Sequence, residues 1–430
     1  MKTARQVLEA PTSDVWRDPK PGERQETIVE VMATLDMKRD RNGNPVGPKR
    51  SLLNLDRIVK RDSWYRSRLR RNGLSESVEW QGRRMRDEDV TRIRLCIARD
   101  YDLQFSVEDT HAVLTETAWA LTYHPVVRYL KGLLWDEEPR IDTFLSAYLG
   151  VEDSPLNRAV SRRWFISAVA RAFGKGEAPV KVDTVLILAG PQGARKSTCF
   201  RALASGPWFS DTALDLRSKD AYQAIRGVWI YELAELAATR PRDAETVKAF
   251  LSAPTDRYRP PYGRSIIESH RQCVFVGTTN EASFLRDVTG ARRFWPVTVG
   301  AIDIPGIIRD RDLLWAEAVE AYRAGEEWWL TREEDETLRD AHSKYQHEDP
   351  WEVIVDEWLA KPENVAHARN GMRIGEMLTH CIQIDGGKQG KHDEMRMGGV
   401  LQAMGWQKFR SRRGSRRLIL WRLPDDEAQQ

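Results

Sequence analysis

The sequence predicts an α/β fold built on a mostly parallel sheet. Three apolar runs have the length and continuity of strands that are buried on both faces: residues 184–189, 227–232 and 273–280. Segments with helical periodicity separate these runs, as expected when helices connect parallel strands. A glycine-containing loop directly follows the first run, and a second helical pattern begins at Ser197. This strand–loop–helix order is the setting that a phosphate-binding loop requires.

Composition narrows the class of protein further. A chain of 430 residues is long enough for two to four domains, and 41% hydrophobic with 30% charged residues indicates a globular protein. The net charge is only +3, so local clusters of charge are the better guide to partners. The four cysteines form no closely spaced pair, which fits neither a disulfide framework nor a zinc ribbon. Because no long apolar run appears, we expect no membrane span and a location in the bacterial cytosol.

The pattern along the chain predicts five segments. These are a basic α+β region at 1–110, a helical region at 111–175, the α/β core at 176–345, a small module at 351–423 and an unstructured tail at 424–430.

Residues 27–34, in the first of these segments, have the composition of a strand. Residues 49–71 are strongly basic and include Trp64 and Tyr65, which suits phosphate contact with base stacking. The alternative is a solvated helix face with two aromatic residues in the core.

The loop at 190–198 is the candidate ATP-binding segment. Glycines let backbone N–H groups surround a phosphate, Lys196 supplies positive charge, and the Ser197 hydroxyl is placed to ligate Mg²⁺. Arg195 stands where this pattern usually has glycine. If the position needs a positive φ, arginine costs about 1 kcal/mol there. The predicted ATP-binding residues are Gly190, Pro191, Gln192, Gly193, Ala194, Arg195, Lys196, Ser197 and Thr198.

Polar residues near the ends of the later strands complete a candidate catalytic set with Lys196. Glu232 ends the second apolar run, where a carboxylate is placed to hold Mg²⁺ or polarise the attacking water, and Glu235 is close enough in sequence to share that task. Asn280 ends the third run and is placed to orient water against the γ-phosphate. The alternatives are an exposed carboxylate at a helix start and an asparagine cap.

Arg292 and Arg293 follow a Thr-Gly-Ala turn at 289–291. An arginine there is placed to act in trans, reaching the phosphates bound by a neighbouring subunit and stabilising the charge of the transition state. The alternative is a structural pair that bonds the carboxylates of Asp287 or Glu281.

The C-terminal module has the pattern of a winged helix. Helices are predicted at 372–384 and 393–404, followed by a basic hairpin turn at 408–417 and a returning strand at 418–421. Residues 408–422 contain no acidic residue, which predicts contact with DNA phosphates. The alternative is a solvated basic wing without a partner. The basic residues are Lys408, Arg410, Arg412, Arg413, Arg416, Arg417 and Arg422.

A series of short sequence motifs in a fixed order carries a resemblance to a known family. They occupy residues 124–125, 135–142, 190–198, 229–236, 247–252, 256–264, 277–281 and 287–296. In these residues the chain resembles the virulence-associated protein E family of phages and mobile elements, and is similar to the superfamily 3 helicases, a type of AAA+ ATPase. The resemblance spans about residues 115–345, and it departs from the usual motif at Arg195.

The resemblance implies an AAA+ core at 176–345, a collar-like role for 111–175, and a homo-oligomeric ring, expected to be a hexamer. It also implies that Lys248 and the segment 256–264 face the pore and grip single-stranded DNA. Charge and aromatic content agree with that role, because arginines contact phosphates and tyrosines stack on bases. The alternative is a polar loop with two packed tyrosines. The predicted DNA-binding residues are Lys248, Arg257, Tyr258, Arg259, Tyr262 and Arg264, with Arg410, Arg412, Arg413, Arg416 and Arg417 in the wing.

Two functions remain in competition. The first is an ATP-hydrolysing helicase that replicates a phage or mobile element, with ATP, Mg²⁺, single-stranded DNA, origin duplex and host replication proteins as partners. The second is a DNA-binding initiator or regulator in which nucleotide acts as a switch and little is hydrolysed, an idea prompted by Arg195. A small-molecule kinase is disfavoured, because such an enzyme has no use for two basic DNA-type modules.

Overall fold

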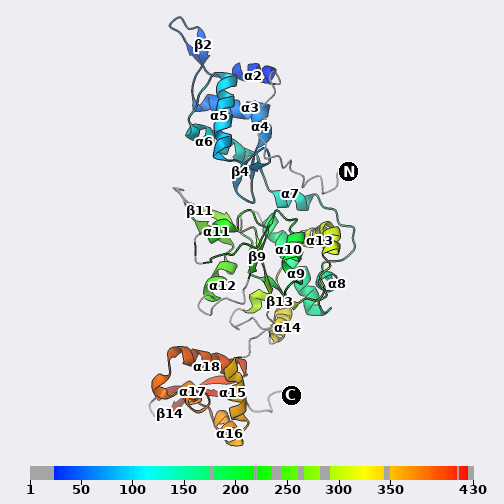
Figure 1. Cartoon of the computed structure of the whole chain (residues 1–430), viewed down its shortest axis with the longest axis vertical. Coiled ribbons are helices and arrows are strands. Elements are labelled where there is room, and N and C mark those ends of the chain that lie inside the picture. The colour runs from blue at the N-terminus through cyan, green and yellow to red at the C-terminus, as the bar shows by residue number, and fades with distance from the viewer. Residues whose placement is uncertain are drawn as a thin grey trace. The chain divides into compact units, whose positions relative to one another are not determined.

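The computed structural model divides the chain into two compact units, residues 1–345 and 346–430 (Figure 1). It describes residues 24–174, 178–216, 218, 220–234, 244–259, 266–280, 291–342, 349–413 and 416–424. Glu235, Tyr262, Arg264 and the tail from residue 425 therefore lie outside the described residues. Among the described helices, none has both the length and the apolar character needed to cross a bilayer.

Residues 24–123, here called the N-terminal module, are mixed α and β. Its helices are α2 (Gln25–Met32), α3 (Leu52–Arg61), α4 (Ser63–Arg68), α5 (Asp87–Tyr101) and α6 (Val107–Ala120). Its strands are β1 (Met37–Arg39) and β2 (Pro45–Pro48), which form a hairpin, and β3 (Leu69–Asn72), β4 (Ser77–Trp80), β5 (Arg83–Arg84) and β6 (Thr122–Tyr123), which form a second sheet.

Two features of the N-terminal module answer questions that the sequence left open. The strand predicted at 27–34 is wrong, because this segment is helix α2, whose residues Ile28, Val31 and Met32 recur at helical spacing and pack on the module core. Trp64 and Tyr65 are 5% and 0% exposed and belong to that core. The aromatic residues of the basic run are therefore unavailable to stack on bases.

The predicted parallel sheet is confirmed. It has the strand order β13-β7-β12-β9-β8, and all four neighbouring pairs are parallel. The strands are β7 (Val185–Ala189), β8 (Phe209–Ser210), β9 (Ile230–Ala234), β12 (Val274–Thr279) and β13 (Phe294–Thr298). Every residue of β7 is buried, as expected for a strand with helices on both faces.

Alternation along β7 assigns the two faces of the sheet. Leu186 and Leu188 pack with α9 (Pro155–Phe173), α10 (Lys196–Leu203) and α13 (Ile304–Arg323) in one core cluster. Val185 and Ile187 pack with α11 (Ala221–Ala224) and α12 (Ala244–Ser252) in another. Figure 1 shows β9 between these two sets of helices.

The remaining elements of the first unit surround the sheet. They are α7 (Pro125–Lys131), α8 (Phe144–Leu149), the antiparallel pair β10 (Thr255–Tyr258) and β11 (Ile267–His270), the short helix η3 (Ala291–Arg293) and α14 (Arg332–His342). The long helix α9 begins where sequence rules place it. The Ser154 hydroxyl accepts the N–H of Asn157, and Pro155 occupies the first turn.

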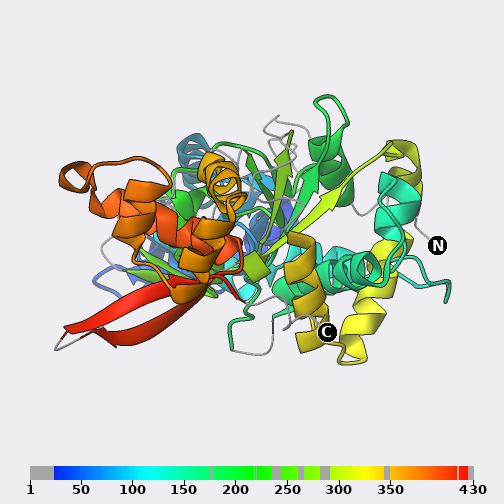
Figure 2. The same cartoon turned by 90° about the horizontal axis from the view of Figure 1, so that it is seen from below.

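The second unit has its own hydrophobic cluster, around Val355, Met377 and Leu401. Its elements are α15 (Pro350–Leu359), α16 (Pro362–Asn370), α17 (Ile374–His380), η5 (Gly386–Lys388), α18 (Lys391–Ala403), β14 (Gln407–Arg413) and β15 (Arg416–Arg422). The helix predicted from 372 begins only at Ile374, because Met372 exchanges two backbone hydrogen bonds with Trp421. The basic hairpin β14–β15 forms as expected, a two-stranded ribbon (Figure 2).

Trp229 packs the sheet against the helices that cover it. We therefore expect its removal to destabilise the protein. Its indole is fully buried, lies 4.3 Å from the Trp315 ring between centroids, and donates to the Ala168 carbonyl at 2.9 Å. Trp229→Ala should lower the free energy of unfolding by about 3–5 kcal/mol, because it leaves a large cavity. Denaturant titration followed by circular dichroism measures this. Trp329→Ala is the control, because that indole is 48% exposed. Equal effects of the two substitutions would contradict the packing described.

Candidate functional site

The loop at 190–195 connects β7 to α10 and adopts a tightly curled backbone. Gly190 is required sterically, because a Cβ at this position would lie 2.8 Å from Cγ2 of Val299. Gly193 has a φ of +84°. Arg195 has φ 62° and ψ 27°, the left-handed conformation, and stands at the N-cap of α10. The strain anticipated at Arg195 is therefore present, at a position where glycine carries no such cost.

Lys196 is 7% exposed, and its ammonium is held by three oxygen acceptors. Nζ donates to the carbonyl oxygens of Gly190 and Pro191 at 2.8 and 2.9 Å, and to Oδ1 of Asn280 at 2.9 Å. Burial lowers the pKa of Lys196, and the nearby Glu232 carboxylate opposes that shift. The Lys196 side chain thus turns back over its own loop, against the residue that follows β12.

Glu232 is the buried acid of the cluster, with 2% exposure. Its Oε1 accepts hydrogen bonds from the Ser197 hydroxyl at 2.8 Å and from the Thr278 hydroxyl at 2.5 Å. Its Oε2 is buried and has no hydrogen-bond partner among the described residues. A buried carboxylate oxygen without a donor is costly unless something else satisfies it.

The donors around Glu232 fit a magnesium ion that is also coordinated by a nucleotide. Mg²⁺ is held in such sites by one or two protein oxygens, with phosphate and water oxygens supplying the rest. The Glu232 carboxylate and the Ser197 hydroxyl offer two such oxygens side by side. Within the described part of the chain, no group of three or more acidic, histidine or cysteine side chains forms a metal site on its own.

Sheet topology explains why these residues meet. β7, β12 and β9 are parallel neighbours, and their carboxyl ends coincide: Thr279 is opposite Ala189, and Thr278 is opposite Ala234. Residues that follow or end these strands therefore share one edge of the sheet. Thr278 was not among the predicted site residues. The signal for it was its position, two residues before Asn280 at the end of a buried strand.

Arg292 and Arg293 lie at the opposite edge of the sheet. Phe294, the next residue, pairs with Val185, the first residue of β7. Five strand residues, roughly 17 Å, therefore separate this edge from the phosphate loop of the same chain. Arg293 donates to the Ser252 hydroxyl at 3.0 Å and lies 3.7 Å from Asp183, whereas Arg292 is exposed. Asp287 and Glu281, the alternative partners, lie outside the described residues.

The predicted DNA-gripping residues fall into two groups. Arg257 and Arg259 are exposed on β10 and just after it, and Arg257 forms a 3.0 Å ion pair with Glu268. Tyr258 is 5% exposed and stacks on Tyr222, so the prediction that it stacks on bases is wrong. In a strand, alternate side chains face inward, and Tyr258 takes the inward place. Lys248 is only 8% exposed and has an interaction partner within the chain.

The basic hairpin of the second unit presents exposed cations over aromatic rings. Lys408 lies 5.6 Å from the Trp421 ring centroid, and the Arg422 guanidinium lies 5.4 Å from that of Phe409. Arg410 is exposed on the same ribbon. For the remaining four arginines the structure describes only the strand pairing, Arg412 with Arg417 and Arg413 with Arg416.

Comparison with known families supplies the identification. A model of the virulence-associated protein E-like domain matches residues 130–347, slightly more than half of the chain. The chain belongs to this family. The match agrees with the region of about 115–345 that carries the resemblance in sequence.

Solved structures add only a weak similarity to this virulence-associated protein E-like chain. The apo structure of the NrS-1 C terminal region (305–718) is 13% identical, with a TM-score of 0.39, over 68% of this chain and 77% of that one. An A form apo structure of the same region is 14% identical, with a TM-score of 0.40, over 69% and 78%. No curated protein matches the chain.

The positive φ of Arg195 predicts the effect of replacing it. Arg195→Gly should leave the free energy of unfolding unchanged or raise it by up to about 1 kcal/mol, because glycine adopts this conformation without a Cβ clash. Arg195→Ala keeps the Cβ and should be less stable than the glycine variant. Denaturant titration of the three proteins checks the order. A glycine variant less stable than the alanine variant would show that the strain is not relieved.

Proposed function

We propose that this family member is an ATP-dependent DNA helicase or translocase of the superfamily 3 type, acting in the replication of a phage or mobile element. The observation that carries the proposal is the cluster in which the buried Lys196 meets Asn280 and Ser197 meets the buried Glu232. This arrangement combines the charge, metal-binding oxygens and water-orienting amide that phosphoryl transfer from ATP uses. The proposal includes an AAA+ core around the parallel sheet and a winged helix in the second unit.

Each residue has a role that its position supports. Backbone N–H groups of the loop and the first turn of α10 cradle the phosphates. Lys196 exchanges its carbonyl acceptors for phosphate oxygens, and Ser197 and Glu232 hold Mg²⁺, which when bound neutralises charge on the phosphates. Asn280 and the free oxygen of Glu232 orient the water that attacks the γ-phosphorus. Loss of the bond to the bridging oxygen completes hydrolysis.

The separation of the two edges of the sheet supports an oligomeric ring. The phosphate loop lies at one edge and Arg292 at the other, so Arg292 has no route to the nucleotide of its own subunit. A head-to-tail contact between copies brings these two edges together, and repeating that contact closes a ring when the rotation allows. The exposed Arg292 is the better candidate for this role, because Arg293 is bonded within its own chain.

Basic surfaces support DNA as the partner. Arg257 and Arg259 are exposed at the hairpin arm, here defined as β10 and β11, and Lys408, Arg410 and Arg422 are exposed on the wing. Such cations bind the phosphate backbone without regard to sequence. Two basic surfaces, one in each unit, suit an enzyme that binds both a single strand and a duplex.

An initiator or regulator with a nucleotide switch is the competing function, favoured by the strained Arg195 beside Lys196. In that case the same site binds ATP and Mg²⁺ and sets the oligomer, but turnover is negligible. The two functions agree on nucleotide binding and differ in hydrolysis.

Substitutions of Lys196 and Glu232 distinguish the helicase from the nucleotide switch. Lys196→Ala and Glu232→Gln should each lower ATP turnover by about 100-fold or more, because each removes charge stabilisation in the transition state. Glu232→Gln should still bind ATP. Steady-state phosphate release, with and without Mg²⁺ and single-stranded DNA, measures this. The control is Lys181→Ala, a lysine with 61% exposure that precedes β7.

The outcomes of this experiment are distinct. Full turnover by Lys196→Ala would show that the mechanism is wrong. A wild-type protein that binds ATP tightly and binds a specific duplex, yet releases no phosphate, would favour the switch.

Mixing two inactive variants tests whether Arg292 acts in trans. Arg292→Ala should lower turnover by about 10³-fold or more, as loss of an arginine finger does. Mixed with Lys196→Ala, it should recover part of wild-type turnover, because some subunit interfaces then combine an intact lysine with an intact arginine. Lys196→Ala mixed with Glu232→Gln is the control, because both residues serve their own subunit's site. No recovery in the first mixture would exclude a role in trans.

A further inference from the structure

The turn at residues 73–76, between β3 and β4, reaches from the N-terminal module into the core of the sheet. Leu74 is 4% exposed and belongs to the hydrophobic cluster of the sheet rather than to that of its own module. Its carbonyl accepts the N–H of Gly227 at 3.2 Å. The approach is close, because a Cβ at Gly227 would lie 3.2 Å from the Ser75 Cβ.

Glu76, the last residue of the turn, bonds two segments of the core at once. Its Oε2 forms a 2.8 Å ion pair with Arg226, and its Oε1 accepts the Ser269 hydroxyl at 2.5 Å. Arg226 in turn lies over the Tyr258 ring of the hairpin arm, 4.7 Å from its centroid. Glu76 has a φ of 52°, a left-handed conformation that is uncommon for glutamate and is kept where surrounding contacts enforce it.

A second set of bonds ties the same turn to the connection between β11 and β12. The Gln272 amide donates to the Gly73 carbonyl at 3.2 Å, and its Oε1 lies 2.8 Å from Nε2 of His124. The other His124 nitrogen accepts the N–H of Val127, so Nε2 carries the proton that Gln272 accepts. His124 belongs to one of the sequence motifs that carry the family resemblance, and this motif contributes no residue to the candidate nucleotide site.

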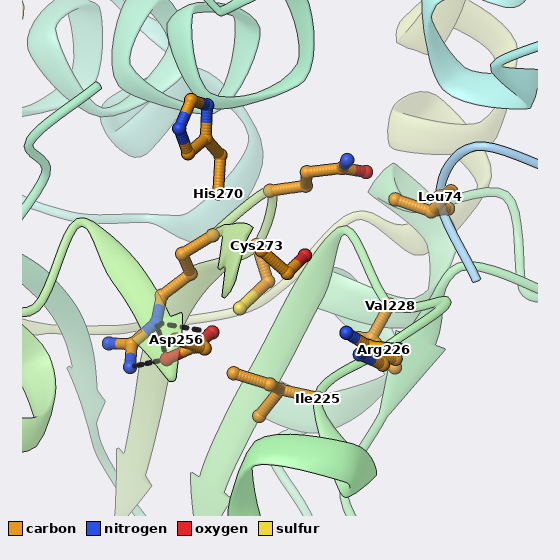
Figure 3. A pocket seen from close by; sticks show the side chains of 10 residues that line it. Leu74, Ile225, Arg226, Val228, Asp256, His270 and Cys273 are labelled. Atoms are coloured by element: carbon orange, nitrogen blue, oxygen red, sulfur yellow. Dashed lines mark hydrogen bonds and ion pairs between the residues drawn. The ribbon is translucent and has the colours of Figure 1, made fainter. Parts of the chain in front are cut away.

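Beside these contacts lies a partly open cavity of about 20 Å³, room for a single water molecule. Figure 3 shows Leu74, Ile225, Arg226 and Val228 on one side of it and Asp256 and Cys273 on the other. Within the described part of the chain, the polar contacts of residues 73–76 with the core end on Arg226, Gly227, Ser269 and Gln272. Arg226 and Gly227 precede β9, Ser269 lies on β11, and Gln272 lies between β11 and β12; none of the four belongs to β7 or α10.

The positions of these four residues divide the candidate nucleotide site into two parts. Lys196 and Ser197 come from the segment after β7, which the turn does not bond. Glu232 is the third residue of β9, Thr278 lies near the carboxyl end of β12, and Asn280 follows that strand, whereas the turn bonds the segments that lead into these two strands. β9 and β12 are paired along their length, so a small shift of the segments that lead into them is carried to Glu232 and to the carboxyl end of β12, roughly 17 Å from its start.

We propose that Glu76 is a positioning residue for ATP hydrolysis: by bonding Arg226 and Ser269, it sets where β9 and β12 place Glu232 and Asn280 relative to phosphates held by Lys196. The N-terminal module thus acts on turnover rather than on nucleotide binding. This inference rests on the proposed function and assigns a further residue to it. Hydrolysis depends on the placement of the water-orienting groups to within a fraction of an ångström, whereas binding depends chiefly on the phosphate loop.

The test is whether Glu76→Ala lowers the rate of ATP turnover while it leaves ATP binding unchanged. Alanine also carries a Cβ, so the backbone strain at position 76 stays and only the carboxylate is lost. We expect kcat to fall about fivefold to twentyfold, with KM for ATP and the affinity for a non-hydrolysable ATP analogue within about twofold of wild type. Arg226→Ala should have the same effect. The double variant should lose little more, because the two residues form one pair.

Glu79→Gln is the matched control. Glu79 lies on β4, close in sequence to Glu76, but bonds Asn72 and Tyr123 within the N-terminal module. Its kcat should stay within about twofold of wild type. An unchanged kcat in Glu76→Ala, an increase in KM in place of the loss of kcat, or an equal loss in Glu79→Gln would each overturn the proposal.

Amide hydrogen exchange separates failure of this proposal from failure of the proposed function. Without nucleotide, Glu76→Ala should exchange about tenfold faster than wild type at the far ends of β9 and β12, including Leu233 and Thr278, and Glu79→Gln should not. This measurement needs no ATP turnover. If wild type hydrolyses no ATP, the helicase proposal fails while exchange still decides whether Glu76 positions these strands. Equal exchange in the two variants would overturn the inference.

Discussion

The carboxylate of Glu232 is the interaction on which the candidate site depends. It lies within the sheet, almost without solvent, and accepts hydroxyls from α10 and from β12 at the same oxygen. Three separate segments of the chain are thereby held to one point. A buried anion with one unsatisfied oxygen is unfavourable unless a cation satisfies it. In the proposed function, a nucleotide-bound metal ion would supply that cation.

The order of the parallel strands places the two halves of the proposed catalytic arrangement at opposite edges of one sheet. The groups proposed to contact phosphate lie toward the carboxyl ends of β7, β9 and β12, as ligand-binding groups generally do in open parallel sheets. Arg292 is left at the amino ends, with its neighbour Arg293 already bonded to Ser252. A single copy has one half of the proposed catalytic arrangement at each edge. In the proposed function, assembly of copies joins the halves.

The N-terminal module extends this arrangement. Its buried aromatic residues Trp64, Tyr65 and Trp80 belong to its own core, and its turn at residues 73–76 contacts the core of the sheet. The turn bonds segments that lead into β9, which carries Glu232, and β12, which Asn280 follows. A module that reads in sequence as a basic DNA-type region thus also contacts the strands of the candidate site.

Local sequence was sufficient to predict the parallel sheet and the loop between β7 and α10, because continuous apolar runs and glycine spacing are local consequences of burial and turn geometry. It placed Glu232 at the end of its strand, whereas β9 continues to Ala234. It also located the basic hairpin of the second unit. Local sequence did not determine which alternating strand residues face inward, so Tyr258 was taken for a surface residue, and it mistook the amphipathic helix α2 for a strand. Only the tertiary structure decided that Thr278 shares the Glu232 oxygen, that Arg292 lies at the far edge, and that Glu76 reaches Arg226. Each of these depends on strand order and on contacts between residues distant in sequence, which no local pattern encodes.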